Sequence, residues 1–165
     1  ISALVNIQLT KDTDTGEVTV QKLNTAVDCG KAINPLIVEG QVEGGTIQAM
    51  GWALREDMYP YATGSECESP EFNPNFRPLN LSDYAIATTL DVPEIVGAYV
   101  ETLEGEGPYG AKAAGEICAN TAAPAIVNAI HNAVGIWVTD LPATPDKVLR
   151  LLKEQGNQPG GNGHE

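Results

Sequence analysis

The feature that most constrains the fold of this chain is a predicted helix that contains four glycines. Asn34 and Pro35 form a helix start, because asparagine is a preferred N-cap residue and proline fits the first helical position. The helical pattern covers residues 35–57 and includes Gly40, Gly44, Gly45 and Gly51. Each of these glycines costs about 1 kcal/mol relative to alanine. We therefore expect the glycine face to touch another backbone or a ligand.

Two glutamines lie on the same face of this predicted helix as two of the glycines. With 3.6 residues per turn, the shared face carries Gln41, Gly44, Gly45 and Gln48. Small residues on such a face allow a second helix to pack closely. They also leave room for a ligand beside the two amide side chains. The pattern alone leaves both interpretations open.

The remaining pattern predicts an α+β domain with mixed strands and about three helices. The β-rich runs 3–9 and 17–23 flank a turn sequence, which is typical of a hairpin. Further predicted elements are strands at 84–89 and 95–100, a strand or extended link at 136–138, a helix at 121–134 and a final helix after Thr144-Pro145-Asp146. Residues 60–80 are typical of a long irregular segment that binds or covers a neighbour. We assign residues 1–155 to the domain and 156–165 to a disordered tail.

Charge and cysteine content exclude several classes of function. The net charge is −13 over 165 residues, which suits neither a nucleic-acid backbone nor an anionic membrane surface as a partner. No apolar run approaches the roughly eighteen residues of a membrane-spanning helix. The three cysteines are scattered and lack metal-ligand spacing. We therefore predict neither a disulfide framework nor a zinc site, and a reducing cytoplasmic location.

The candidate catalytic group is Glu116, which follows a run of small residues in Gly-Pro-Tyr-Gly-Ala-Lys-Ala-Ala-Gly-Glu. These small residues allow a bulky guest to lie against the backbone beside the carboxylate. Glu116 also precedes the predicted helix 121–134, whose start carries the positive end of the helix dipole. A partly buried carboxylate in this position suits a general base. The alternative is structural, with Lys112 as the salt-bridge partner of Glu116.

Two long motifs resemble one known family. Residues 27–45 read Val-Asp-Cys-Gly-Lys-Ala-Ile-Asn-Pro-Leu-Ile-Val-Glu-Gly-Gln-Val-Glu-Gly-Gly, and residues 107–116 carry the glutamate segment. Together with Leu-Pro-Ala-Thr-Pro-Asp-Lys-Val-Leu at 141–149, they are similar to the molybdenum-binding subunit of the xanthine dehydrogenase/aldehyde oxidase family. The resemblance extends to about residue 153 and concerns only the C-terminal part of that subunit, so we expect a fragment or a split subunit. The chain departs from the pattern at Ala113, where many members carry glycine.

The resemblance implies roles for particular residues. Glu116 matches the family's catalytic glutamate, which deprotonates a hydroxyl on molybdenum so that it attacks an electron-poor carbon. The positions implied to lie near the cofactor are Gln41, Gly44, Gly45, Lys112 and Gly115. The cofactor is molybdopterin or its cytosine dinucleotide, and its dithiolene holds the metal, so no protein side chain is implied as a metal ligand. On this basis the face of Gln41 and Gln48 is expected to meet a ligand.

The resemblance also implies a reaction and partners. We expect part of a molybdenum-dependent oxidoreductase that hydroxylates a purine-like N-heterocycle or an aldehyde and is inactive as this isolated chain. Its partners would be the remainder of the molybdenum subunit and components that carry iron–sulfur clusters, with or without FAD. A branch that oxidises aldehydes or carbon monoxide is an alternative. A non-catalytic assembly domain with the same fold is another, although the presence of Glu116 and Gln41 argues against it.

Overall fold

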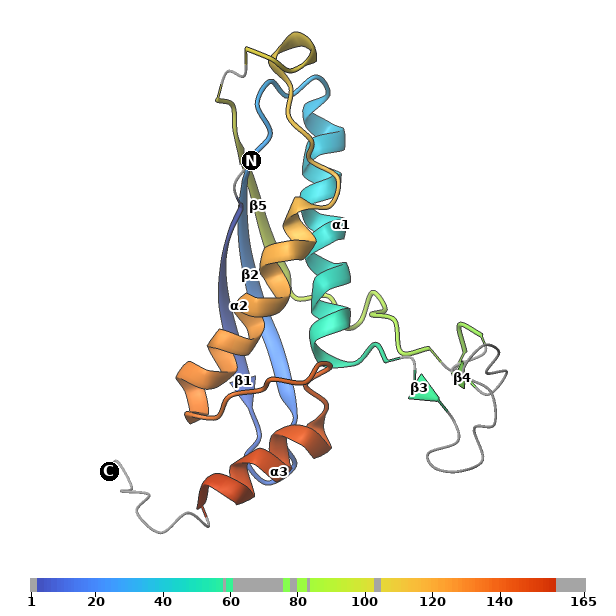
Figure 1. Cartoon of the computed structure of the whole chain (residues 1–165), viewed down its shortest axis with the longest axis vertical. Helices are drawn as coiled ribbons and strands as arrows, with labels where there is room; N and C mark the ends of the chain where they lie inside the picture. Colours follow the sequence, from blue (N-terminus) through green and yellow to red (C-terminus); the bar gives the residue numbers. More distant parts are fainter. Residues whose placement is uncertain are drawn as a thin grey trace.

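A three-stranded sheet with two long helices on one face forms the centre of the computed structural model (Figure 1). The structure describes residues 3–57, 59–60, 76–77, 80–82, 84–102 and 105–156. The strands are β1 (Ala3–Lys11), β2 (Val18–Asp28) and β5 (Glu94–Val100), in the order β1-β2-β5. The helices are α1 (Pro35–Leu54), α2 (Ile117–Val134) and α3 (Pro145–Gly156). The predicted α+β fold with three helices and mixed strands is confirmed.

The central strand β2 pairs with its two neighbours in opposite senses. It runs antiparallel to β1 through the predicted hairpin and parallel to β5. The hairpin turn is closed by Asp12, whose carboxylate accepts the backbone N–H of Asp14 at 2.8 Å and that of Thr15 at 3.3 Å. A parallel pair needs a long crossover, and α1 supplies much of it between β2 and β5. The ends of β2 and β5 therefore lie side by side.

A β-bulge in the β1–β2 pair changes which residues of β2 face the helices. The pairing register shifts between Gln8 and Leu9, because these residues face Lys22 and Val20 and leave Gln21 without a partner position. As a result Val20 and Leu23 are both buried although they stand three residues apart. Only one face of β2 is buried, and it is the face that α1 and α2 cover.

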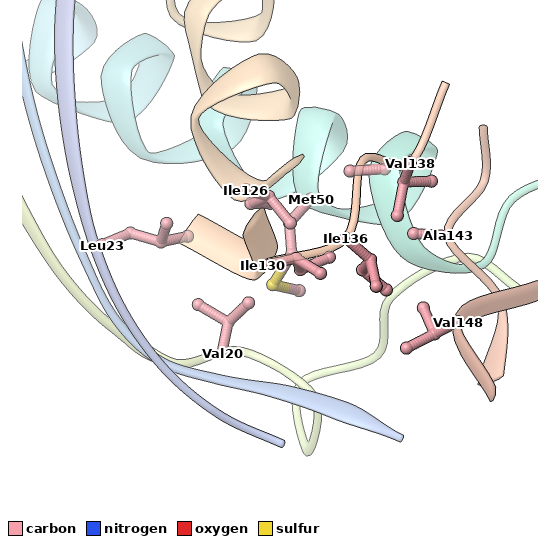
Figure 2. Close-up of a cluster of buried hydrophobic side chains, with 10 residues drawn as sticks. Val20, Leu23, Met50, Ile126, Ile130, Ile136, Val138, Ala143 and Val148 are labelled. Atoms are coloured by element: carbon pink, nitrogen blue, oxygen red, sulfur yellow. The ribbon is translucent and has the colours of Figure 1, made fainter. Parts of the chain in front are cut away.

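The main core lies between this face and the helices. Leu23 on β2 and both Ile126 and Ile130 on α2 are at most 1% exposed. Met50 of α1 and Val148 of α3 join the same cluster, which Figure 2 shows. The predicted helix at 121–134 therefore packs its apolar residues Ile126 and Ile130 on the sheet. Residues 136–143 add a further part of the cluster through an extended link and not through a strand.

Several helix boundaries in the structure differ from the predicted ones. The first long helix ends at Leu54, where the N–H of Arg55 donates to the carbonyl of Gly51 at 2.9 Å. Its start is as predicted, with the Asn34 side chain accepting the N–H of Ile37. The second helix begins at Ile117, four residues earlier than predicted. Gly156 belongs to α3, whereas the prediction placed it in the tail, and residues 157–165 lie outside the described part of the chain.

The predicted strand at 84–89 is wrong. Residues 84–88 form no strand. Local side-chain hydrogen bonds at the end of this segment replace pairing with a neighbouring strand. The carboxylate of Asp91 accepts both the N–H and the hydroxyl of Thr88, which closes a local turn.

Most of the predicted irregular segment 60–80 and the third cysteine, Cys67, lie outside the described residues. The short pair β3 (Tyr59–Pro60) and β4 (Phe76–Arg77) is antiparallel. None of the helices in the described part of the chain combines the length and apolar character that a bilayer crossing requires.

We predict that Gly16→Ala destabilises the chain by about 2–4 kcal/mol, because left-handed backbone and steric overlap both oppose a side chain there. Gly16 has a φ of +79°, and an added Cβ would lie 2.1 Å from the carbonyl oxygen of Pro145 and 2.8 Å from the nitrogen of Leu149. Chemical denaturation measures the effect. In the control Gly40→Ala, the added Cβ meets nothing within 4 Å, and the exposed helix should gain about 0.5–1 kcal/mol. Equal stabilities of the two variants would contradict the docking of the hairpin turn on α3.

Candidate functional site

Glu116 is the N-cap residue of α2. Its carbonyl accepts the N–H of Ala119 at 3.1 Å, whereas its side chain makes no capping bond. The carboxylate therefore stands at the positive end of an 18-residue helix with its oxygens available. The expected partial burial is not found, because Glu116 is exposed and its small neighbours leave the side chain uncovered.

An open pocket lies beside this carboxylate. Its volume is about 540 Å³, and Ala113, Gly115, Glu116, Ile117 and Asn120 line it. A Cβ added at Gly115 would meet nothing within 4 Å, so the backbone here is open to close approach. This volume lies in the range of small-molecule and cofactor sites. A pocket with one carboxylate, one amide and an uncovered backbone fits the edge of a large polar cofactor.

Gly45 touches α2 and not the pocket. A Cβ added at Gly45 would lie 3.2 Å from the Cβ of Cys118 and 3.8 Å from the carbonyl oxygen of Gly115. Gly45 is buried, and its missing side chain lets α1 and the start of α2 approach closely. For this glycine the structure shows the helix–helix contact, and the cofactor role that the resemblance implies stays a prediction. The contact places Gly45 and Gly115 together.

The other residues of the predicted glutamine–glycine face are not among those that line the pocket at Glu116. Gly44 and Gln48 line a second pocket of about 310 Å³, together with Ile47, Glu56, Ile86 and Ala87. This pocket shares no lining residue with the one at Glu116. Gln41 is exposed one turn before Gly45 on α1. The face that the sequence treats as one surface is thus divided between a helix contact and an open pocket.

Lys112 does not pair with Glu116. Its ammonium lies 2.6 Å from Asp28 Oδ2 at the end of β2 and also donates to Thr102 Oγ1 at 2.6 Å. The structural alternative for Glu116 is therefore wrong, and among the described residues Glu116 has no ion-pair partner. The sequence analysis did not predict this contact of Asp28. The only signal in the sequence was the shared presence of Asp28 and Lys112 in the two family motifs.

Tyr109 is a second residue that sequence reasoning missed. It lies in the 3₁₀ turn η1 (Pro108–Gly110) with a φ of +57°, and its side chain is 90% exposed. A bulky residue in left-handed backbone is an outlier that costs about 1–3 kcal/mol and often marks a functional segment. A backbone hydrogen bond fixes the end of this turn, because the N–H of Lys31 donates to the carbonyl of Gly110 at 2.8 Å. The glutamate segment is therefore a strained turn that residues 111–116 connect to the start of α2.

Glu56 and Tyr84 form a polar contact near the second pocket. The hydroxyl of Tyr84 donates to Glu56 Oε2 at 2.6 Å. The carboxylate of Glu56 also lies over Gly51, where an added Cβ would come within 1.8 Å of Oε1. Because these neighbouring atoms belong to the flexible end of Glu56, this contact alone does not require glycine at position 51. The hydrogen bond to Glu56, followed by burial, raises the pKa of Tyr84 to about 12.

Comparison with known proteins assigns the family. Residues 4–93 match the molybdopterin cofactor-binding domain family, and the chain belongs to it. The chain is 36% identical over 142 residues to the xanthine dehydrogenase molybdenum-binding subunit of Escherichia coli O157:H7, covering 86% of this chain and 18% of that protein. It is 34% identical over 146 residues to the aldehyde oxidoreductase of Megalodesulfovibrio gigas, covering 88% of this chain and 15% of that protein.

A solved structure has the same fold. Quinoline 2-oxidoreductase from Pseudomonas putida 86 superposes with a TM-score of 0.78 at 31% identity, covering 91% of this chain and 18% of that chain. The chain thus spans less than a fifth of the length of each of these three relatives. The predicted family and its molybdenum–pterin cofactor are confirmed at the level of the family. The residue assignments at Glu116, Gln41 and their neighbours stay predictions.

We predict that Gly45→Val destabilises the chain by about 1–3 kcal/mol, because overpacking would push α1 away from the start of α2. Gly44→Val is the matched control, since it makes the same change one residue earlier, where an added Cβ meets nothing within 4 Å. Thermal or urea unfolding of the two variants measures the difference. If Gly44→Val were the more damaging change, the division of the glycine face described above would be wrong.

We predict that the phenol of Tyr84 ionises near pH 12, whereas an ordinary tyrosine ionises near pH 10. Its folded-state pKa is raised, so this hydrogen bond contributes stability fully below about pH 10 and loses it as the pH rises through about 12. Tyrosinate absorbance during an alkaline titration measures the ionisation. Tyr84→Phe should remove this late step, and Glu56→Ala should move it back toward pH 10. A titration curve that neither variant changes would contradict the assignment.

Proposed function

We propose that this chain supplies the general base of a molybdenum hydroxylase, and that the base is Glu116. The observation that carries the proposal is the placement of the Glu116 carboxylate at the start of α2, on the rim of a pocket of about 540 Å³. The family assignment supports a molybdopterin-type guest in that pocket. An exposed carboxylate that forms no ion pair among the described residues is free to accept a proton.

The residues around Glu116 have separable roles in this proposal. The uncovered backbone at Gly115 lets the cofactor edge approach the carboxylate without steric conflict. Asn120 stands one helical turn after Glu116 and offers an amide that can orient a polar group in the same pocket. Ile117 gives the pocket an apolar wall. The bound cofactor supplies the redox chemistry, namely a water-derived oxygen and an acceptor for two electrons.

In the reaction Glu116 takes the proton from the attacking hydroxyl group. The overall change converts a C–H bond and one water into a C–OH bond, two protons and two electrons. The carboxylate holds one of those protons and releases it to solvent through the open side of the pocket.

The substrate we propose is an electron-poor N-heterocycle, with an aldehyde as the alternative. Quinoline and xanthine, in the names of two relatives, are N-heterocycles, and the third relative is named for aldehydes. The relatives extend far beyond the aligned part, so we propose that the rest of the cofactor and substrate site comes from the remainder of a molybdenum subunit. We further propose iron–sulfur partners, with or without a flavin component, a cytoplasmic location, and inactivity of this chain by itself.

We predict that Glu116→Gln in the assembled enzyme lowers turnover at least about a hundredfold while molybdenum content stays unchanged, because the amide cannot accept the proton. Steady-state kinetics and metal analysis measure the two quantities. Glu17→Gln makes the same chemical change at an exposed position in the hairpin and should leave turnover unaltered. Turnover that survives in Glu116→Gln would refute the base assignment and favour a non-catalytic assembly role.

A further inference from the structure

Three side chains meet at the end of the β2–β5 strand pair. The ammonium of Lys112 donates to Asp28 Oδ2 and to Thr102 Oγ1, each at 2.6 Å. The hydroxyl of Thr102 donates to the same Asp28 oxygen at 2.6 Å. Asp28 ends β2, Thr102 follows β5, and Lys112 belongs to the segment that leads to Glu116. The three groups therefore join two strands to the candidate catalytic segment.

Backbone contacts reinforce this junction. The N–H of Lys112 donates to the carbonyl of Cys29 at 2.9 Å, and Gly30 forms an antiparallel bridge with Ala111. Gly30 has a φ of +59°, and an added Cβ would lie 2.4 Å from the carbonyl oxygen of Gly110. Its N–H donates to Asp28 Oδ1 at 3.0 Å, so both carboxylate oxygens of Asp28 are used. The contact is a short two-stranded pairing with an ion pair beside it.

This ion pair is better shielded from water than the other ion pairs in the described part of the chain. The side chains of Lys112 and Asp28 are 13% and 18% exposed, whereas Lys22 and Glu94, which join the same two strands at the opposite end, are 33% and 62% exposed. The hydrogen bond from Lys112, followed by that from Thr102, holds the pKa of the Asp28 carboxyl well below its usual range. Asp28 is therefore the anionic partner of Lys112 at neutral pH.

The segment between Lys112 and α2 is short and open. Ala113 and Gly115 are exposed, and only three residues separate Lys112 from Glu116. At its far end, the Gly115 carbonyl and the first turn of α2 lie against Gly45. The backbone that carries Glu116 is thus fixed at two points, by the ion pair on β2 and by the helix contact on α1.

We propose that Asp28 and Lys112 are positioning residues for Glu116, and that their ion pair fixes segment 107–116 against the end of β2. This gives Lys112 a different task from the cofactor contact that the family resemblance implies. The consequence for catalysis rests on the proposed function of Glu116, whereas the ordering of the segment does not. Without the ion pair the carboxylate keeps its chemistry but loses its fixed place at the pocket.

Hydrogen exchange in the assembled enzyme tests the ordering. In Asp28→Asn and in Lys112→Met, the backbone amides of Lys112 and Lys31 should exchange about tenfold faster, because a charge-assisted bond beside them is lost. Glu94→Gln is the matched control, since it removes the 2.6 Å ion pair at the other end of the same strands and should leave these amides unchanged. Thr102→Val deletes only the bridging hydroxyl and should give a smaller change in the same direction, even if a charge variant fails to fold.

Kinetics test the positioning role. The two charge variants should lower kcat several-fold at constant KM and constant molybdenum content, and Lys112→Arg should recover part of kcat because it keeps the charge. Unchanged exchange at Lys112 and Lys31, or faster exchange with an unchanged kcat, would overturn the proposal. Retained turnover in Glu116→Gln would instead remove the base assignment, and the exchange data would still decide whether the ion pair orders the segment.

Discussion

The close approach of α1 to the first turn of α2 at Gly45 is the constraint on which the candidate site depends. Any side chain at this position would meet the Cβ of Cys118 and the backbone of α2. Because the helices touch here, both can lie on the one buried face of β2 and cover its core residues. The same contact fixes where α2 begins, and therefore where Glu116 stands.

A second constraint acts at the opposite end of the same segment. The end of β2 holds Lys112 through Asp28, and the pairing of Gly30 with Ala111 fixes the backbone beside it. Between the two constraints the chain is small, exposed and open to a guest. This arrangement separates two tasks, because packing and ion pairing set the position of the carboxylate while the intervening residues leave space for chemistry.

The sequence predicted the local structures well where the cause was local. The hairpin followed from turn residues between two β-rich runs, and the helix start followed from Asn34 and Pro35, whose effects act within a few residues. The strand predicted at 84–89 failed because Asp91 binds Thr88 and closes a turn that no period-two pattern reveals. The proposed pairing of Lys112 with Glu116 failed because a stronger partner, Asp28, lies 84 residues away in the sequence.

The sequence by itself determined the family, the α+β class and the two motifs that contain Glu116 and the glycine-rich helix. It could not determine which glycine meets a helix and which faces a pocket. Gly44 and Gly45 are neighbours with the same composition around them, yet one turns to open space and the other to Cys118. A rotation of about 100° per residue around the helix axis separates them. Only the packing of α1 against α2 decides which direction is covered.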